Sequence, residues 1–272
     1  MGFDQQKLAV ALNPGREYTY LPFSLHIFDS VASTSQTLWS LLDQGAETGS
    51  VVIATQQTAG RGQWGRQWIS ATGGLYLSVA IAPKLEANNS YQLTFASAWG
   101  IAAQLQKCGV SVGIKWPNDL VLNGRKLGGI LTETKVHKGQ ITQAVIGVGI
   151  NWANPVPETG INLESWQASQ DTRPISCLEM LTSAVLLGIE SGIECLFQTG
   201  VSTLLSRYAN LLTNMGDTVE VNNLSGTIVG VTSEGNLRVS SKHYDATALK
   251  TQEFYVEPGT ISLGYRRSSV EL

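Results

Sequence analysis

The loop Gly60–Trp68 holds the densest group of residues that could bind an anion. Its sequence, GRGQWGRQW, places glycines around Arg61 and Arg66. Glycines let the backbone turn its N–H groups towards a ligand, and the arginine fork suits phosphate or carboxylate. Residues 60–65 also satisfy GxGxxG, but a dinucleotide site needs a strand running directly into the first glycine, and polar residues 56–59 precede it here. We therefore expect an anion-binding loop; a plain surface loop is the alternative.

The segment Lys115–Asp119, with the sequence KWPND, is the second candidate for chemistry. Pro117 forces the preceding residue into an extended conformation, so a rigid kink presents the flanking side chains. Asn118 and Asp119 offer amide and carboxylate oxygens that could hold a nucleotide or a hydrated magnesium ion. The alternative is a simple turn before the next strand, where Pro-Asn-Asp is favoured anyway.

Two glycine-containing segments follow at short range. Arg125–Ile130 sets Lys126 at the mouth of a predicted hairpin, with two glycines behind it. Gly147–Asn151 ends a predicted buried strand with positions that lack side chains, where a ligand could lie against the backbone. Taken singly, a hairpin lysine is usually solvated and strand glycines often mark bulges.

Together, these segments resemble the motifs of biotin–protein ligases in order and spacing. The matching stretches are QTAGRG at 57–62, KWPND at 115–119, RKLGGI at 125–130 and GVGIN at 147–151. Ser33–Gln36 resembles the family's Ser-Thr-Asn segment, with Ser35 in place of the asparagine. Gly259–Leu263 resembles the last strand of the family's C-terminal SH3-like domain. The resemblance covers about residues 25–265, and the combination is far more specific than any one motif.

The resemblance implies an enzyme that joins biotin to ATP as biotinyl-5′-AMP, releases pyrophosphate and passes the biotinyl group to a lysine. It implies ATP and Mg²⁺ as cofactors, biotin as substrate and the biotin carboxyl carrier protein or domain of acetyl-CoA carboxylase as partner. It also implies a catalytic domain that resembles class II aminoacyl-tRNA synthetases. Some members begin with a DNA-binding winged helix; about 24 residues precede the first matching strand, too few for such a module, so we expect the monofunctional form.

The resemblance assigns residues to two parts of one site. The predicted biotin-binding residues are Ser33, Thr34, Ser35, Gln57, Gly60, Arg61, Gly62, Gln63, Lys126, Gly129 and Gly147. The predicted ATP- and adenylate-binding residues are Trp64, Arg66, Lys115, Asn118, Asp119 and Asn151. Lys126, Arg61 and Asp119 form the predicted catalytic set, and the metal ligands stay open apart from a possible role for Asp119. Lys126 would lie beside the biotin carboxylate and the α-phosphate, where a fixed ammonium lowers the cost of bringing two anions together.

The sequence leaves two points open: how the loop holds the adenylate without a second arginine, and which group accepts the proton of the acceptor lysine. Most relatives carry a second arginine after Gly62, where this chain has Gln63, which keeps hydrogen-bonding capacity but loses the charge. Trp64 could compensate by capping the adenine, or the adenylate could be held more loosely. Either Asp119 or the released nucleotide phosphate could accept the proton of the acceptor lysine.

Two other functions compete with this interpretation. A lipoate–protein ligase shares the fold type in outline, but Gly60–Trp68 and Lys115–Asp119 match the biotin side better. A non-enzymatic sensor of biotin or of an adenylate is the second alternative. Lys126 has no obvious purpose in such a passive binder.

Composition limits the classes of partner. The formal net charge is -3 and no run of Lys and Arg occurs, which argues against nucleic-acid binding. The three cysteines are far apart, so we expect no disulfide framework and a cytoplasmic location. We expect no membrane partner, because no apolar segment approaches the ~20 residues that span a bilayer. A homodimer is possible if a strand at Val110–Ile114 pairs with a second copy across a sheet edge.

Alternating and periodic patterns predict the elements that position these motifs. Strands are expected at Leu25–Asp29, Val51–Ala54, Gly74–Ala82, Asp119–Leu122, Gly129–Lys135 and Gln143–Gly149. Helices are expected from a capping box at Ser33–Gln36 to about Asp43, at Ser90–Lys107 and at Ser176–Phe197, with Asn151–Gln170 as a loop. Asn123-Gly124 predicts a hairpin turn.

The fold class that follows is α+β, with two domains. Residues 1–214 are expected to form the catalytic domain, a mixed sheet with flanking helices. After Asn214, short stretches alternate between β-branched and polar residues and are punctuated by glycines. We expect residues 215–272 to form a small SH3-like β-barrel to about residue 265, followed by a tail.

Overall fold

A mixed eight-stranded sheet forms the centre of the larger part of the molecule. The computed structural model describes residues 3–12, 21–245 and 248–265. The strand order is β1-β2-β3-β8-β7-β6-β5, with β4 beside β8; β1 and β2 are parallel and the other pairs antiparallel. The strands are β1 (Ser24–Phe28), β2 (Ser50–Ala54), β3 (Leu75–Ile81), β4 (Leu85–Glu86), β5 (Gly113–Lys115), β6 (Asp119–Leu122), β7 (Arg125–His137) and β8 (Gln140–Ile150).

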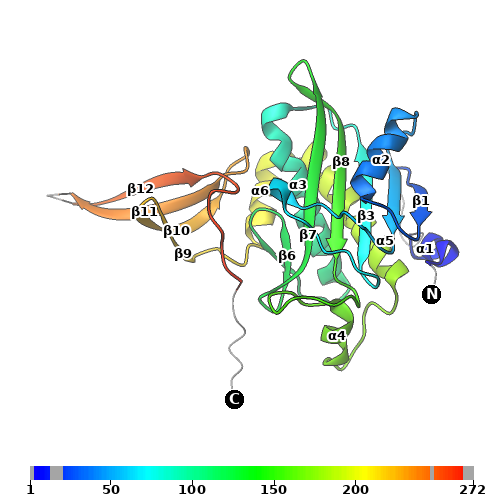
Figure 1. Ribbon diagram of the computed structural model, residues 1–272. Coiled ribbons are helices and arrows are strands. Elements are labelled where there is room, and N and C mark those ends of the chain that lie inside the picture. The colour runs from blue at the N-terminus through cyan, green and yellow to red at the C-terminus, as the bar shows by residue number, and fades with distance from the viewer. Residues whose placement is uncertain (1–2, 13–20, 246–247, 266–272) are drawn as a thin grey trace.

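Helices cover both faces of this sheet (Figure 1). Helix α2 (Thr34–Asp43) packs on one face, and α3 (Ser90–Lys107) and α5 (Leu178–Thr199) lie on the other. Strand β2 is apolar after Ser50 because both of its faces are covered. Val52 packs on the α2 side, whereas Val51 and Ile53 belong to the main core. Glycines bring α3 and α5 close together, because a Cβ at Gly100 would overlap the Gly188 carbonyl. The expected mixed sheet with flanking helices is confirmed.

Helix α5 corrects one expectation about membranes. Among the described residues, α5 is the one helix that is both long enough and apolar enough to cross a bilayer, with a mean hydropathy of 1.5. Yet 72% of the relevant window is buried inside the protein, chiefly against α3. An apolar segment of this length therefore does exist, and its burial explains its composition as that of a core helix.

A second sheet of four antiparallel strands projects from the larger part of the molecule (Figure 1). It comprises β9 (Thr218–Val221), β10 (Leu224–Val231), β11 (Leu237–Asp245) and β12 (Ala248–Val256), paired in simple sequence order. No pairing of β9 with β12 closes it into a barrel among the described residues. The predicted last strand at 259–263 is wrong, because these residues lie outside any strand and run alongside the larger part of the molecule.

Several local predictions are confirmed and others are corrected. Asn123 and Gly124 have φ of 49° and 70° and form the turn between β6 and β7. Ser33 is the N-cap of α2, but its side chain makes no capping bond, so the capping box is wrong. The supposed loop 151–170 contains α4 (Leu163–Ala168), which is capped by Asn162.

Two helices, α1 (Gln5–Leu12) and α6 (Val201–Ala209), were not predicted. Both are short, and their buried residues make sense only against the larger helices that they contact.

The predicted dimer-forming edge is already occupied. Strand β5 ends the sheet, but the Ile114 N–H donates to the Leu211 carbonyl at 2.7 Å and the Thr213 N–H donates to the Ile114 carbonyl at 2.8 Å. Val110, Val112 and Ile114 are also fully buried. Pairing of this edge with a second copy is therefore contradicted, since residues 211–213 of the same chain satisfy it.

Candidate active site

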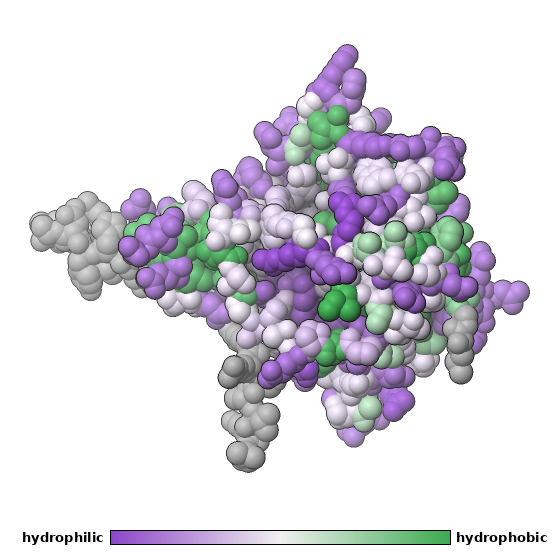
Figure 2. Space-filling view, viewed as in Figure 1, coloured by the Kyte–Doolittle hydropathy of each residue, from purple (hydrophilic) through white to green (hydrophobic). Residues whose placement is uncertain are grey.

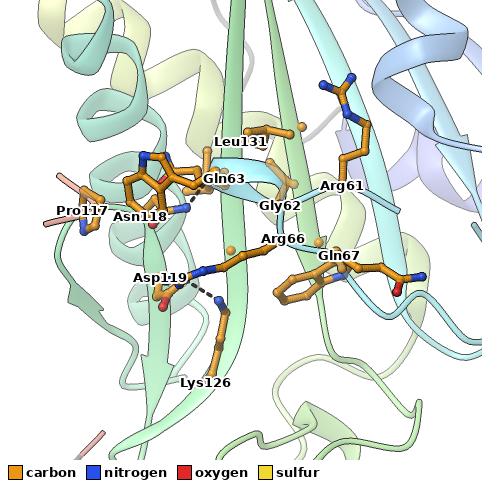
Figure 3. Close-up of a pocket in the computed structure, with 18 of the residues that line it drawn as sticks. Arg61, Gly62, Gln63, Arg66, Gln67, Pro117, Asn118, Asp119, Lys126 and Leu131 are labelled. Atoms are coloured by element: carbon orange, nitrogen blue, oxygen red, sulfur yellow. Dashed lines mark hydrogen bonds and ion pairs between the residues drawn. The ribbon is translucent and has the colours of Figure 1, made fainter. Parts of the chain in front are cut away.

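One pocket collects nearly all of the predicted site residues. Its walls are the loop Gly60–Trp68, the start of α2, the facing parts of β7 and β8, the Lys115–Asp119 segment and residues 259–263 (Figure 3). The predicted residues that line it are Ser33, Thr34, Ser35, Gln57, Arg61, Gly62, Gln63, Trp64, Arg66, Lys115, Asn118, Asp119, Lys126, Gly129 and Gly147. Segments far apart in sequence thus meet at one side of the sheet.

A chain of neutral hydrogen bonds forms one end of the pocket. The Gln57 carboxamide oxygen accepts from the backbone N–H of Thr34 at 2.8 Å and from its hydroxyl at 3.2 Å. The Ser78 hydroxyl donates to Thr34 at 2.9 Å and lies 3.1 Å from the Ser35 hydroxyl. Gln57 is itself fixed because its amide donates to Ser70 at 2.8 Å. Rigid, uncharged donors and acceptors of this kind suit a small polar group on an otherwise apolar ligand.

Glycines on β7 and β8 form the floor beside this network. Gly129 pairs with Gly149, and Gly147 lies two residues further along β8. A Cβ at Gly147 would approach the Ser35 hydroxyl to 2.8 Å, and one at Gly149 would overlap the Trp68 indole. The glycines therefore leave room for the Ser35 hydroxyl and the Trp68 indole, which a side chain at either position would displace.

Charged side chains form the opposite end. The Lys126 ammonium lies 2.6 Å from Asp119 Oδ1, and the Lys115 ammonium lies 3.6 Å from Oδ2. The Tyr265 hydroxyl donates to the same Oδ2 at 2.5 Å. Burial lowers the pKa of Lys115, an effect that the nearby Asp119 partly opposes. Two cations around one carboxylate leave net positive charge, which suits an anionic ligand.

The β6–β7 hairpin holds Lys126 in place through its backbone. The Lys126 N–H donates to the Thr159 carbonyl at 2.8 Å, and the Ile161 N–H donates to the Lys126 carbonyl at 2.9 Å. Asn118 is fixed in the same way, because its side-chain amide donates to the Ile130 carbonyl at 2.7 Å. The backbone of Lys126 is thus held by its neighbours, while its side chain extends into the pocket and pairs with Asp119.

The glycine–arginine loop folds back on itself across the pocket. The Trp68 N–H donates to the Gly60 carbonyl at 3.0 Å, and the Gly62 N–H donates to the Arg66 carbonyl at 2.7 Å. The Arg61 guanidinium pairs with Glu133 at 2.9 Å, and Figure 3 shows this side chain pointing away from Lys126. The loop thus presents its backbone and Arg66, rather than the Arg61 charge, to the charged end.

Two predicted residues lie behind the pocket and do not line it. The Asn151 side chain donates to the Lys126 carbonyl at 3.3 Å and accepts from Asn154 at 3.0 Å, so it braces the lysine strand. A Cβ at Gly60 would overlap the Trp68 carbonyl, which explains the glycine by loop packing. Their sequence positions inside the motifs gave no sign of this difference.

Sequence reasoning left several lining residues out of the predicted site. Trp68 is one: its indole lies 5.1 Å from the Lys126 ammonium, and its N–H is buried without a partner among the described residues. Its place in the glycine–arginine loop was a usable signal. The other lining residues are Gln67, Trp116, Pro117, Ile130, Leu131, Val148, Gly149, Gly259, Ile261, Ser262 and Leu263. Residues 259–263 carried no such signal, because only the tertiary structure brings them here.

The residues present do not form a magnesium site by themselves. No cluster of three or more metal-binding side chains occurs in the part of the chain that is described. Asp119 is the one carboxylate among the lining residues, and two lysines and a phenol already occupy its oxygens. The expectation that Asp119 holds magnesium therefore does not fit this arrangement.

Comparison with known proteins places this site in a family. The model of the Biotin/lipoate A/B protein ligase family matches residues 27–151. The Bifunctional ligase/repressor BirA of Salmonella typhimurium is 34% identical over 218 residues, which cover 73% of this chain and 67% of that protein. The BirA of Bacillus subtilis is 37% identical over 125 residues, but the match spans only 38% of its length.

Solved structures agree on the fold. The biotin protein ligase from Aquifex aeolicus in complex with biotin and ATP has a TM-score of 0.65 at 23% identity, covering 84% of this chain and 95% of that chain. The Leishmania major biotin protein ligase in complex with biotinyl-5-AMP has a TM-score of 0.60 at 20% identity, covering 86% and 99%. These structures show the shared fold, and the 34% identity to the Salmonella relative over two thirds of its length shows that the chain belongs to the biotin/lipoate A/B protein ligase family and, within it, to the biotin–protein ligases.

Proposed function

We propose that this protein activates biotin with ATP to biotinyl-5′-AMP and transfers the biotinyl group to a lysine of a carrier protein. One observation carries the proposal: the Lys126–Asp119 ion pair, at 2.6 Å, lies in the same pocket as the neutral network of Gln57, Thr34 and Ser35. Biotin needs both ends, because its ureido group is neutral and its carboxylate must meet a phosphate. The names of its relatives, among them the Biotin--[acetyl-CoA-carboxylase] ligase of Paracoccus denitrificans, support the same activity.

In the first half-reaction, a biotin carboxylate oxygen attacks the α-phosphorus of ATP, a new P–O bond forms and pyrophosphate leaves. Both reactants are anions, so the reaction depends on fixed positive charge where they meet. Two observations support this role for Lys126: its ammonium lies 2.6 Å from Asp119, and its backbone is held by hydrogen bonds to Thr159 and Ile161. Lys115 and Arg66 line the same end and would contact the phosphates.

In the second half-reaction, the neutral amine of the acceptor lysine attacks the acyl carbon and AMP leaves. A base must accept the proton that the amine loses. Asp119 Oδ1 already pairs with Lys126, and Oδ2 accepts from Tyr265 and lies 3.6 Å from the Lys115 ammonium. We therefore propose that the nucleotide phosphate, rather than Asp119, takes the proton.

The glycine–arginine loop would protect the mixed anhydride from water. Hydrogen bonds within the loop join Gly62 to Arg66 and Gly60 to Trp68, and Trp64 packs against Gly259. Trp64 has φ of 54° and remains 49% exposed, so its expected role as a cap on adenine stays a prediction. A closed, water-free pocket preserves a labile intermediate.

Biotin-dependent exchange of labelled pyrophosphate into ATP tests the first half-reaction. We expect exchange with biotin and none with lipoate; exchange with lipoate alone would reassign the substrate. Transfer of labelled biotin to the biotin carboxyl carrier domain of acetyl-CoA carboxylase tests the second. Tight adenylate binding without transfer to any carrier would favour the sensor alternative. The Mg²⁺ requirement, the cytoplasmic location, the absence of nucleic-acid and membrane partners and the homodimer stay predictions, as does the domain division at residue 215.

A further inference from the structure

The segment Gly259–Tyr265 contacts two parts of the site, the glycine–arginine loop and the Lys126–Asp119 ion pair. At its start, a Cβ on Gly259 would lie 2.8 Å from the Trp64 ring, so loop and segment are in close contact. Its middle residues, 261–263, line the pocket. At its end, the Tyr265 hydroxyl donates to Asp119. Figure 1 shows the segment running from β12 back to the catalytic part, and Figure 2 shows polar residues around the junction.

Tyr265 reaches Asp119 from behind the pocket. Its side chain lines a neighbouring groove beside β9, and it is not among the residues that line the catalytic pocket. Its ring lies 4.0 Å from the Lys115 ammonium, which is a favourable cation–π contact. Tyr265 therefore supports the charged end without occupying the space that a ligand needs.

The phenol fixes the second oxygen of the Asp119 carboxylate. Oδ1 is held by Lys126 at 2.6 Å, whereas Oδ2 has Lys115 at 3.6 Å, beyond ordinary hydrogen-bonding distance. The Tyr265 hydroxyl, at 2.5 Å, is thus the short bond to Oδ2. Burial, and then the charge of Asp119, raise the pKa of Tyr265, so the phenol stays a proton donor. A carboxylate held at both oxygens cannot rotate, and its direction towards Lys126 is set.

We propose that Tyr265 is a positioning residue for adenylate formation, acting on Lys126 through Asp119. This proposal rests on the proposed function and adds to it a residue from the C-terminal segment. It predicts that the segment contributes to the rate of the chemical step rather than to the affinity for biotin. The reason is that Tyr265 bonds to Asp119 in the charged group, whereas Gln57, Thr34 and Ser35 of the neutral network are held by bonds to one another, to Ser70 and to Ser78.

Tyr265→Phe tests the proposal because it removes the hydroxyl and keeps the ring beside Lys115. We expect kcat of biotin-dependent pyrophosphate exchange to fall about ten-fold, as for one hydrogen bond to a charged group, with the KM for biotin within about two-fold of wild type. Tyr255→Phe is the matched control: Tyr255 lies on β12 with 58% exposure, and its variant should exchange at the wild-type rate. An unchanged kcat for Tyr265→Phe, or a rise in KM alone, overturns the proposal.

A double-mutant cycle with Asp119→Asn distinguishes positioning from a general effect on folding. If Tyr265 acts through Asp119, Tyr265→Phe lowers the residual single-turnover rate of Asp119→Asn by less than about two-fold. An equal ten-fold loss in both backgrounds overturns the proposal. The same cycle on the urea midpoint tests the contact without any activity. If the urea midpoint of the double variant differs from the sum of the two single effects but the wild type shows no exchange, the proposed function alone is rejected. If the two single effects simply add, the role of Tyr265 is rejected.

Discussion

Replacing Lys126 by alanine tests the centre of the proposed chemistry. The substitution removes an ammonium that lies 2.6 Å from Asp119 Oδ1 and 5.1 Å from the Trp68 ring. We expect biotin-dependent pyrophosphate exchange to fall by about 10²–10³-fold, which is the cost of losing one fixed group that stabilises developing charge. In free energy this is about 3–4 kcal/mol of transition-state stabilisation.

The fold should survive this substitution. The backbone of Lys126 is bonded to Thr159 and Ile161, and neither bond involves the side chain. Asp119 keeps Lys115 and Tyr265 as partners, so no buried charge is left alone. The Lys126 side chain is partly exposed and Asp119 keeps its other partners, so loss of the pair should cost about 1 kcal/mol of unfolding free energy. Urea unfolding followed by circular dichroism measures this cost, and exchange of labelled pyrophosphate measures the rate.

Lys135→Ala is a matched control on the same strand. Lys135 pairs with Asp43 at 2.6 Å, the same distance as the Lys126 pair, but it lies outside the pocket. This variant should keep the wild-type exchange rate with a similarly small change in stability. Unchanged exchange in Lys126→Ala would remove Lys126 from the mechanism. Equal losses of activity in both variants would show that disturbance of β7, and not a missing charge, lowers the rate.

Three further substitutions test the surroundings of the site. Gly149→Ala places a Cβ onto the Trp68 indole, so we expect a strain of about 1–3 kcal/mol and weaker biotin binding by calorimetry; unchanged affinity would contradict the proposed floor. Trp116→Phe removes the 2.9 Å hydrogen bond from the indole N–H to the Gly235 carbonyl, and the urea midpoint should fall by the equivalent of about 1–3 kcal/mol; an unchanged midpoint would show that this link between the two parts of the molecule does not stabilise the fold. Lys115→Met tests the lowered lysine pKa. Between the lowered native pKa and the ordinary value of 10.5, the unfolded chain binds the proton more tightly than the native protein. The free energy of unfolding of the wild type, relative to that of the variant, should therefore rise with pH. If this difference in unfolding free energy stays constant from pH 8 to 10.5, the burial argument is refuted.

Local sequence was sufficient wherever a property depends on neighbouring residues. Asn123-Gly124 fixed its turn, since both residues tolerate positive φ. The long helices α3 and α5 were predicted because they are long enough for apolar residues to dominate their composition. The spacing of the ligase motifs identified the family, and nearly all of the residues predicted from those motifs line the pocket, since each motif carries its own turn, glycine or charge.

Other properties depended on contacts between distant segments, which no local pattern encodes. The β5 edge looked free for a second copy, but residues 211–213 occupy it after a chain reversal of about a hundred residues. Asn151 is predicted to contact the nucleotide, and its sequence gives no sign of the hydrogen bonds that it makes with Lys126 and Asn154.

The C-terminal residues show the same limit at the site itself. Gly259–Leu263 has the composition of a strand, yet it crosses the pocket without joining a sheet. Tyr265 lies 146 residues from Asp119 in sequence and 2.5 Å from it in space. Sequence alone determined which family and which motifs this protein has. The tertiary structure decided which oxygen each donor holds, because hydrogen-bond geometry is a property of the folded chain and not of its motifs.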